Sequence, residues 1–336
     1  MNPTSDLLGN TKGRIANLDI LRAVAALLVC FYHFNRNSLY GGTFYPAITR
    51  YGHYGVDIFF VISGYVIPLA LYKSQFNLGR LSAFLKARWI RLYPAYFAAS
   101  ILTLGLWYAS TTVPGFQGTV PHVTVPQILA NISLSCDFFK QDWFGIVFWT
   151  LAIEAQYYVL VALAFPFLTS GLTRTRIFTL ALWIAAPIFA GQGPTVFTWT
   201  SLFGIGILAF MLQQRLISGI LFWIFLSFAC GVQWFIRSPV STLLGAITVL
   251  CILYLPPIKS RGLIWIGGIS YSLYLLHVPI GGRVMNVIER YPESFAVKLF
   301  AIPLALAASL LAAYMYWRFI EAPSHAAARK IKLRTV

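Results

Sequence analysis

The feature that most constrains this chain is its first apolar run, residues 18–35 (LDILRAVAALLVCFYHFN), which carries Arg22 and His33. The run is long enough to cross most of a bilayer. An ionisable group inside a spanning segment costs free energy, so it normally faces the protein interior and works there. The eleven residues that separate the two side chains make three turns plus about 20°, which puts both on one face, ~16 Å apart along the axis. The run predicts the first helix of a membrane enzyme, with an anion-binding group near its inner end and a base deeper in.

The rest of the chain repeats this apolar character. Of its 336 residues, 59% are hydrophobic and 10% are charged, and the mean hydropathy is +0.74. Recurring apolar stretches of about twenty residues indicate an all-α, polytopic integral membrane bundle. We expect about ten transmembrane helices, at residues 18–36, 54–72, 93–110, 143–168, 177–191, 195–213, 217–235, 239–256, 262–281 and 297–320.

The net charge of +16 would suggest a nucleic-acid partner in a soluble chain. Here the distribution of charge points to membrane topology instead. With a cytoplasmic N-terminus, seventeen Lys and Arg fall in the inner segments and seven in the outer segments, with Arg22 inside the membrane. The positive-inside rule predicts this bias. We therefore expect both termini to be cytoplasmic, and no nucleic-acid partner.

This topology divides the chain into a cytoplasmic N-terminal tail (1–17), a transmembrane domain (18–320) and a basic cytoplasmic C-terminal tail (321–336), disordered from residue 326. Two connections exceed a simple turn. Residues 73–92 have a basic amphipathic pattern typical of a helix that lies in the membrane interface. Residues 111–142 form a long outer loop, and loops of this length are usually functional or flexible.

The cysteines at 30, 136, 230 and 251 lack the spacing of metal ligands or redox pairs, so we expect no metal site. Among the carboxylates, Glu154 stands out because it lies eleven residues into the fourth expected span, ~16 Å deep. A carboxylate there needs a partner or is protonated. Thr150, Tyr157 and Tyr158 share its helical face. Glu154 is either a structural tie between helices or an active-site residue.

The histidines divide by position. His33 is either a neutral core histidine or a catalytic base, and its shared face with Arg22 favours catalysis. His277 ends the segment YSLYLLH at a similar depth, three residues after Tyr274. It orients substrate or another side chain, or it is structural. His53, His122 and His325 lie in loops or the tail and are assigned no role.

Two further segments carry candidate groups. Arg88 and Arg91 lie three residues apart, hence on one helical face, at the inner surface. They bind either lipid headgroups or a phosphorylated donor, because guanidinium groups meet phosphate oxygens in bidentate fashion. In GVDIFFVISGYVIP, Ser63 and Gly64 permit close helix approach. Asp57 is either a helix cap or a group of the acceptor site.

Six of these segments, in this order, resemble the membrane acyltransferase-3 family, which O-acylates cell-surface sugars. The first helix has the family's Arg, ten residues, then His, here Arg22 and His33. The others are GVDIFFVISGY, the Arg88–Arg91 pair followed by LYP, WTLAIEAQYYV around Glu154, GISYSLYLLH, and FIEAP around Glu321. Each motif alone is weak, whereas the ordered set is specific. The chain resembles the short form of the family, without a fused esterase-like domain.

The resemblance implies an O-acyltransferase that takes an acyl group, commonly acetyl, from cytoplasmic acyl-CoA to a hydroxyl of a glycan or glycolipid. It implies no permanently bound cofactor and a place in the bacterial inner membrane, among membrane lipids. The expected catalytic residues are His33, as general base, and Glu154. The expected substrate-binding residues are Arg22, Asp57, Ser63, Arg88, Arg91, Tyr93, Trp149, Tyr271, Tyr274 and His277.

Two other classes of function fit buried ionisable residues. One is a secondary transporter, against which stands the lack of an inverted repeat or of paired broken helices. The other is a flippase-like partner of an envelope polysaccharide pathway, in which the arginines bind lipid phosphate. The sequence does not determine which acyl group is transferred, which sugar accepts it, or the oligomeric state. It also leaves open the choice between direct transfer and a covalent acyl-histidine.

Overall fold

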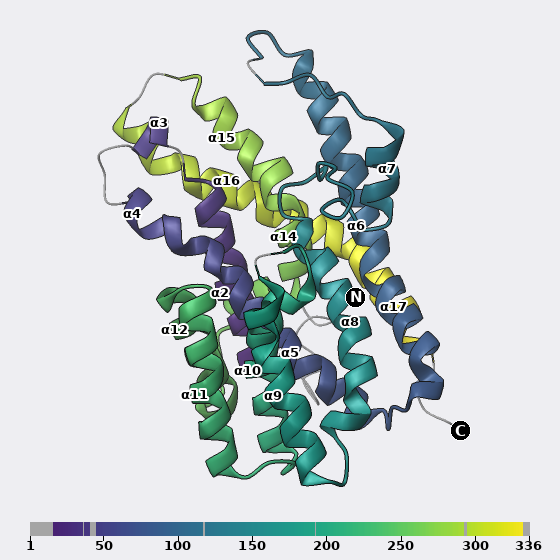
Figure 1. The fold of residues 1–336 in the computed structure, drawn as a ribbon. Helices are drawn as coiled ribbons and strands as arrows, with labels where there is room; N and C mark the ends of the chain where they lie inside the picture. Colours follow the sequence, from purple (N-terminus) through teal and green to yellow (C-terminus); the bar gives the residue numbers. More distant parts are fainter. Residues whose placement is uncertain are drawn as a thin grey trace.

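The fold is described from a computed structural model of the chain (Figure 1). The structure describes residues 16–35, 37–40, 45–116, 118–191, 193–291 and 294–331. Within these ranges every regular element is a helix and there is no strand, which confirms the all-α prediction. Nearly all of the expected N-terminal tail lies outside the described residues.

The centre of the bundle is built from α2 (Ala16–His33), α5 (Gly55–Lys73), α8 (Trp149–Leu168) and α10 (Thr200–Gln213). Helices α5 and α10 cross at two glycines. A Cβ atom on Gly64 would lie 2.1 Å from the carbonyl oxygen of Phe203, and one on Gly206 would lie 2.1 Å from that of Val61. Only hydrogen fits at these points, so the close approach expected from the Ser63–Gly64 segment is confirmed.

Helices α9 (Thr173–Ala190), α11 (Gly219–Ile236) and α12 (Pro239–Tyr254) cover α10 and form one side of the molecule in Figure 1. Each of the last two starts at a serine N-cap. The Ser218 and Ser238 hydroxyls accept hydrogen bonds from the amides of Leu221 and Ser241, at 3.3 and 3.1 Å. Such caps satisfy amides that have no partner within the helix.

Helix α6 (Leu81–Thr111) is one continuous helix of 31 residues, so the prediction of an interfacial helix followed by a separate span is wrong. No turn-forming sequence separates residues 81–92 from 93–110. Pro94 lies inside this helix, where it removes one backbone donor, and the helix continues beyond it. The amphipathic pattern of residues 73–92 predicts that Phe84 and Trp89 share one apolar face. In the structure their environments differ: Phe84 is fully buried, whereas Trp89 is 49% exposed.

The connection from α6 to α8 is longer than expected and contains α7 (Val125–Ile132). It packs on α6, where the Tyr96 hydroxyl donates to the Asn131 carbonyl at 2.8 Å. The Asn131 amide donates in turn to the Asp142 carbonyl at 3.0 Å. Because residues 143–148 belong to this connection, α8 begins at Trp149 rather than at residue 143.

The ninth expected span is broken. It consists of α13 (Arg261–Gly268), α14 (Ser270–Leu276), a π-helical segment η4 (His277–Gly282) and α15 (Arg283–Ile288), and its axis bends by 62° after α13. A Cβ atom on Gly267 would lie 1.9 Å from the Asp19 carbonyl oxygen, so α13 ends in backbone contact with α2. The bend turns α14 across the bundle, and π-helical turns are common at functional sites.

The C-terminal helical run continues past the expected domain limit through α16 (Phe295–Tyr316), η5 (Trp317–Glu321) and α17 (Ala322–Arg329). Figure 1 shows α17 beside α6, and the two helices are in contact. The disorder expected from residue 326 is therefore wrong as far as Arg329, because α6 offers a packing surface. Residues 332–336 lie outside the described part.

Among the described residues, six helices are long and apolar enough to cross a membrane, or seven if the bent pair is one span. Helix α12 is shorter but apolar. The expected spans 93–110 and 177–191 fall on α6 and α9, which carry basic residues. The short elements of the described chain are α3 (Asn37–Tyr40), α4 (Tyr45–Thr49), η1 (Arg50–Tyr54), η2 (Leu78–Arg80) and η3 (Val196–Trp199).

Candidate active site

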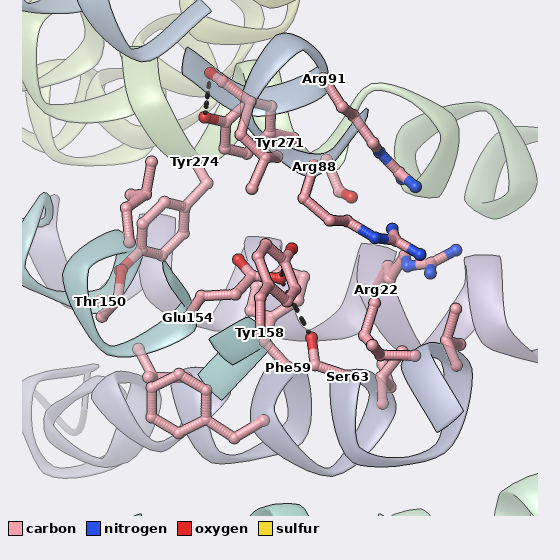
Figure 2. A pocket seen from close by; sticks show the side chains of 18 of the residues that line it. Arg22, Phe59, Ser63, Arg88, Arg91, Thr150, Glu154, Tyr158, Tyr271 and Tyr274 are labelled. Carbon is pink, nitrogen blue, oxygen red and sulfur yellow. Dashed lines mark hydrogen bonds between the residues drawn. The ribbon is translucent and has the colours of Figure 1, made fainter. Parts of the chain in front are cut away.

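A pocket with about 900 Å³ of empty space lies where α2, α5, α6, α8, α14 and α17 meet (Figure 2). Helix α5 contributes an apolar wall and the Ser63 hydroxyl, and the ionisable groups enter from the other helices. Seven residues expected at the site from the sequence line this one pocket, although they come from five separate segments: Arg22, Ser63, Arg88, Arg91, Glu154, Tyr271 and Tyr274.

Three guanidinium groups, those of Arg22, Arg88 and Arg91, converge at one side of the pocket (Figure 2), which we call the arginine end. Arg22 forms an ion pair with Asp19, with 3.2 Å between Nη1 and Oδ1. The guanidinium carbon of Arg88 lies 5.5 Å from the ring centre of Tyr158, within cation–π range. Three cations around one opening suit a ligand with several negative charges.

Two residues at the arginine end were assigned no role from the sequence. Glu321 accepts hydrogen bonds from the amide and the hydroxyl of Ser272, at 3.2 and 2.5 Å. Its other oxygen lies 3.5 Å from Nε2 of His325, and both residues line the pocket. The FIEAP motif marked Glu321 without a role. Glu321 and His325 are four residues apart, which would place them on one face of a helix. The expectation of a tail at residues 321–336 hides this signal.

Glu154 lies in the middle of the pocket, in the second turn of α8. It accepts a hydrogen bond from the Tyr158 hydroxyl at 2.6 Å and one from the Ser63 hydroxyl at 3.4 Å. The second bond joins α8 to α5. Glu154 thus holds two helices together and also presents a carboxyl group to the pocket, which the sequence had posed as alternatives.

The opposite side of the pocket is closed by hydroxyl and aromatic groups around Tyr274 (Figure 2). The hydroxyls of Tyr274 and Thr150 are 3.0 Å apart, and the Tyr274 hydroxyl also donates to the Val147 carbonyl at 3.3 Å. The rings of Phe59 and Tyr274 meet edge to face at 5.9 Å. We call this side the tyrosine end.

Behind the tyrosine end lies a pair of histidines. Nε2 of His277 is 3.1 Å from Nδ1 of His33, and the His277 ring centre is 5.8 Å from that of Tyr274. His277 is completely buried. Among the residues that the structure describes, neither histidine lines this pocket, whereas Tyr274 does, and its ring lies beside that of His277.

The partners of the two rings assign their neutral tautomers. Nδ1 of His277 lies 2.7 Å from the carbonyl oxygen of Tyr274, an acceptor, so this nitrogen carries the proton. Its Nε2 then accepts from Nδ1–H of His33, which also lies 3.0 Å from the Val29 carbonyl. His33 is therefore held with its lone pair on Nε2, the form that a general base requires.

Besides His277, three residues expected to bind substrate lie away from this pocket. Asp57 accepts a hydrogen bond from the Ser241 hydroxyl at 2.5 Å, so it ties α5 to α12 and is not a helix cap. The Tyr93 hydroxyl donates to the Ile132 carbonyl at 2.8 Å, and Trp149 packs against Trp199 with 5.4 Å between ring centres. The described residues contain no group of three His, Cys, Asp or Glu side chains that could hold a metal ion.

Comparison with known proteins identifies the family of the chain. The profile of the acyltransferase-3 family, described as an acyltransferase domain, matches residues 15–318. O-acetyltransferase OatA of Staphylococcus aureus strain NCTC 8325 is 28% identical over 361 aligned residues, which cover 92% of this chain and 57% of that protein. OatA of strain MRSA252 gives the same values.

The chain thus spans little more than half of the length of these curated relatives. No solved structure matches it. Since the family profile covers nine-tenths of the sequence, from before α2 to within η5, the match includes the three arginines, the tyrosine end and the histidine pair, and it stops before Glu321 and His325. The chain belongs to the acyltransferase-3 family.

Proposed function

We propose that this protein is an acyl-CoA-dependent O-acyltransferase that moves an acyl group, acetyl in the simplest case, to a hydroxyl of a cell-envelope or exported carbohydrate. The observation that carries the proposal is the pocket itself. It gathers three arginines at one end and hydroxyl groups at the other, and a histidine pair lies directly behind the hydroxyls.

The arginine end is suited to the donor. The phosphates of CoA would bind Arg22, Arg88 and Arg91, and the pantetheine arm would extend past Glu154 toward Tyr274. Guanidinium groups form paired, charge-assisted hydrogen bonds with phosphate oxygens, which gives both affinity and orientation. The apolar wall from α5 would accommodate the uncharged arm.

His33 would act as the general base. Its Nε2 would take the proton of the acceptor hydroxyl as the oxygen attacks the thioester carbonyl. The new C–O bond forms, the C–S bond breaks, and the proton passes to the departing thiolate as CoA leaves. Both nitrogens of His277 are engaged, one by a carbonyl oxygen and one by His33, and His277 does not line the pocket. We therefore assign stabilisation of the oxyanion to the hydroxyl of Tyr274, which lines the pocket and would exchange its Val147 carbonyl partner for the oxyanion.

Tyr274 would have to move for this reaction. It separates the pocket from the histidines, and it is held there by one hydroxyl partner, Thr150, and one carbonyl. Rotation of the ring would open the pocket to His33 and carry the phenol toward the thioester. A covalent acyl-His33 intermediate uses the same opening, and it would be recognised by acyl label that stays on the protein without acceptor.

The membrane setting completes the proposal. We place about ten helical segments across the bacterial inner membrane, with both termini cytoplasmic, as the distribution of basic residues predicts. The donor would then enter from the cytoplasmic side at the arginine end. His33 ends α2 at the opposite side, where an exported glycan or glycolipid can reach it.

The test is acyl transfer by the purified full chain in lipid vesicles, measured as CoA thiol release and as acyl mass gained by a saccharide. We expect both to require acetyl-CoA and saccharide together. In a strain that lacks the protein, the surface polysaccharide should lose one acyl mass per modified unit. Vesicles that transport saccharide without releasing CoA would contradict the proposal and favour a transporter.

One observation favours a second candidate, a flippase-like protein that binds lipid phosphate. A mainly apolar groove between α6 and α8 shares Arg88 and Tyr158 with the pocket and reaches the exposed side chains of Trp89 and Val159. A lipid chain would fit beside a phosphate at Arg88. Competition between phospholipid and acetyl-CoA for one site, with no CoA release, would select this candidate.

A further inference from the structure

An unbroken row of rings leads from the buried histidine to the surface. The ring centres of His277 and His33 are 4.9 Å apart, and those of His33 and Tyr32 are 5.0 Å apart. The row continues from Tyr32 to His53 at 5.3 Å and from His53 to Tyr54 at 4.0 Å. Tyr32 and His53 are exposed. We call Tyr32, His53 and Tyr54 the ring surface.

The backbone fixes the ring surface beside His33. It is formed by the end of α2 and by η1, and two glycines that flank His53 and Tyr54 press against α2. A Cβ atom on Gly52 would lie 2.2 Å from the Leu28 carbonyl oxygen, and one on Gly55 would lie 2.4 Å from that of Ala25. With contacts this close, η1 cannot slide along α2, so the ring surface is preformed.

Every ring of this surface has a polar edge. Nδ1 of His53 lies 2.7 Å from the Arg50 carbonyl oxygen and so carries its proton, which leaves Nε2 as an acceptor at the exposed rim. The tyrosines contribute hydroxyls. Ring faces with polar edges match a pyranose, whose C–H face is apolar and whose rim consists of hydroxyls, because tyrosine offers a large, rigid contact area with a polar tip.

We propose that the ring surface binds the carbohydrate acceptor and delivers one of its hydroxyls to His33; this inference rests on the proposed function. The spacing of the rings supports this proposal, because a sugar stacked on Tyr32 would lie next to His33, the proposed base. The alternative is that these aromatic residues only anchor the protein at the membrane surface, where tyrosines are enriched. The polar His53 within the row favours the carbohydrate.

The experiment uses the full chain in detergent, with maltotriose and chitotriose as probes. Saturation-transfer NMR measures binding of each saccharide without acyl-CoA, and thiol release measures how the rate depends on saccharide and on acetyl-CoA. Tyr32→Ala removes the stacking ring, and Tyr32→Phe keeps it. Tyr108→Ala is the matched control, since Tyr108 is also exposed but lies on α6.

We expect Tyr32→Ala to weaken the saturation-transfer signal and to raise the half-saturating saccharide concentration about tenfold, a loss of roughly 1.4 kcal/mol. The half-saturating acetyl-CoA concentration should stay unchanged. Tyr108→Ala should behave as wild type, whereas Tyr32→Phe, which keeps the ring but loses its hydroxyl, should raise the half-saturating saccharide concentration less than Tyr32→Ala does.

Two outcomes would overturn the inference: no transfer signal from either saccharide in the wild type, or unchanged saccharide dependence in Tyr32→Ala. A wild-type protein that binds saccharide through Tyr32 but releases no CoA would refute the proposed function and leave the ring surface standing.

Discussion

At the residue scale, the arginines are the groups whose role is easiest to separate from the chemistry. Arg88→Ala should raise the half-saturating acetyl-CoA concentration at least tenfold, because a partly buried guanidinium–phosphate contact contributes about 1.5–3 kcal/mol. Arg88→Lys should recover part of the loss, since a lysine cannot form the paired contact. Steady-state thiol release measures this. Lys86→Ala, an exposed cation on the same helix, is the control and should change nothing; equal effects at both positions would mean that only net charge matters.

A second prediction at this scale concerns His277, which we regard as a positioning residue. His277→Ala removes the acceptor that holds Nδ1–H of His33, so the turnover number should fall about 10–100-fold while the half-saturating acetyl-CoA concentration stays the same. His277→Gln places an amide oxygen near the lost Nε2 and should restore part of the rate. Equal loss in both variants, accompanied by a lower unfolding temperature, would instead indicate a purely structural role.

Single residues were predictable from the sequence where their chemistry is unusual in a membrane. Arg22, Arg88, Arg91 and Glu154 stand out as ionisable groups near apolar runs, and the structure brings all four into one pocket. Asp57 is equally unusual but lies outside the pocket, where it accepts a hydrogen bond from Ser241 of α12 and joins two helices. A sequence gives the face of a helix on which a side chain lies. It does not give the neighbouring helix that this face meets.

At the scale of elements, the break in the ninth span positions the site, and it depends on the contact of Gly267 with α2. Gly267→Ala should destabilise the protein by about 1–3 kcal/mol, because its Cβ would overlap the Asp19 carbonyl. The measurement is thermal unfolding in detergent. Gly262→Ala is a matched control on the same helix, where a Cβ meets nothing within 4 Å. Equal stability of the two variants would show that α13 does not need this contact.

Helix boundaries were the least predictable feature at this scale. Apolar content marks where a span lies, but a helix continues into polar sequence as long as it has a packing partner. For this reason α6 begins at Leu81 and α17 extends to Arg329, each packed against the other. The break after Gly268 was missed for the opposite reason: residues 262–281 contain no Asp, Glu, Lys or Arg, and the contact that ends α13 is made by a distant segment.

At the scale of the whole molecule, composition was sufficient to predict an all-helical membrane protein, and the ordered motifs were sufficient to predict the family. The motifs are dispersed over 300 residues because the pocket needs walls from several helices. The sequence did not predict that Tyr274 closes the pocket at the tyrosine end. Its hydrogen bond to Thr150 joins residues 124 positions apart, which no local pattern encodes.

The central claim is that one catalytic base, His33, acts on a donor held in the arginine-lined pocket. Its most direct test is a single turnover with radiolabelled acetyl-CoA bound to the purified chain in vesicles and a saccharide acceptor added. His122→Ala, which alters an exposed loop histidine, is the control. We predict that His33→Ala binds acetyl-CoA as well as wild type does but transfers the label at least about 100-fold more slowly, whereas His122→Ala transfers it normally. Transfer at the wild-type rate by His33→Ala would contradict the account.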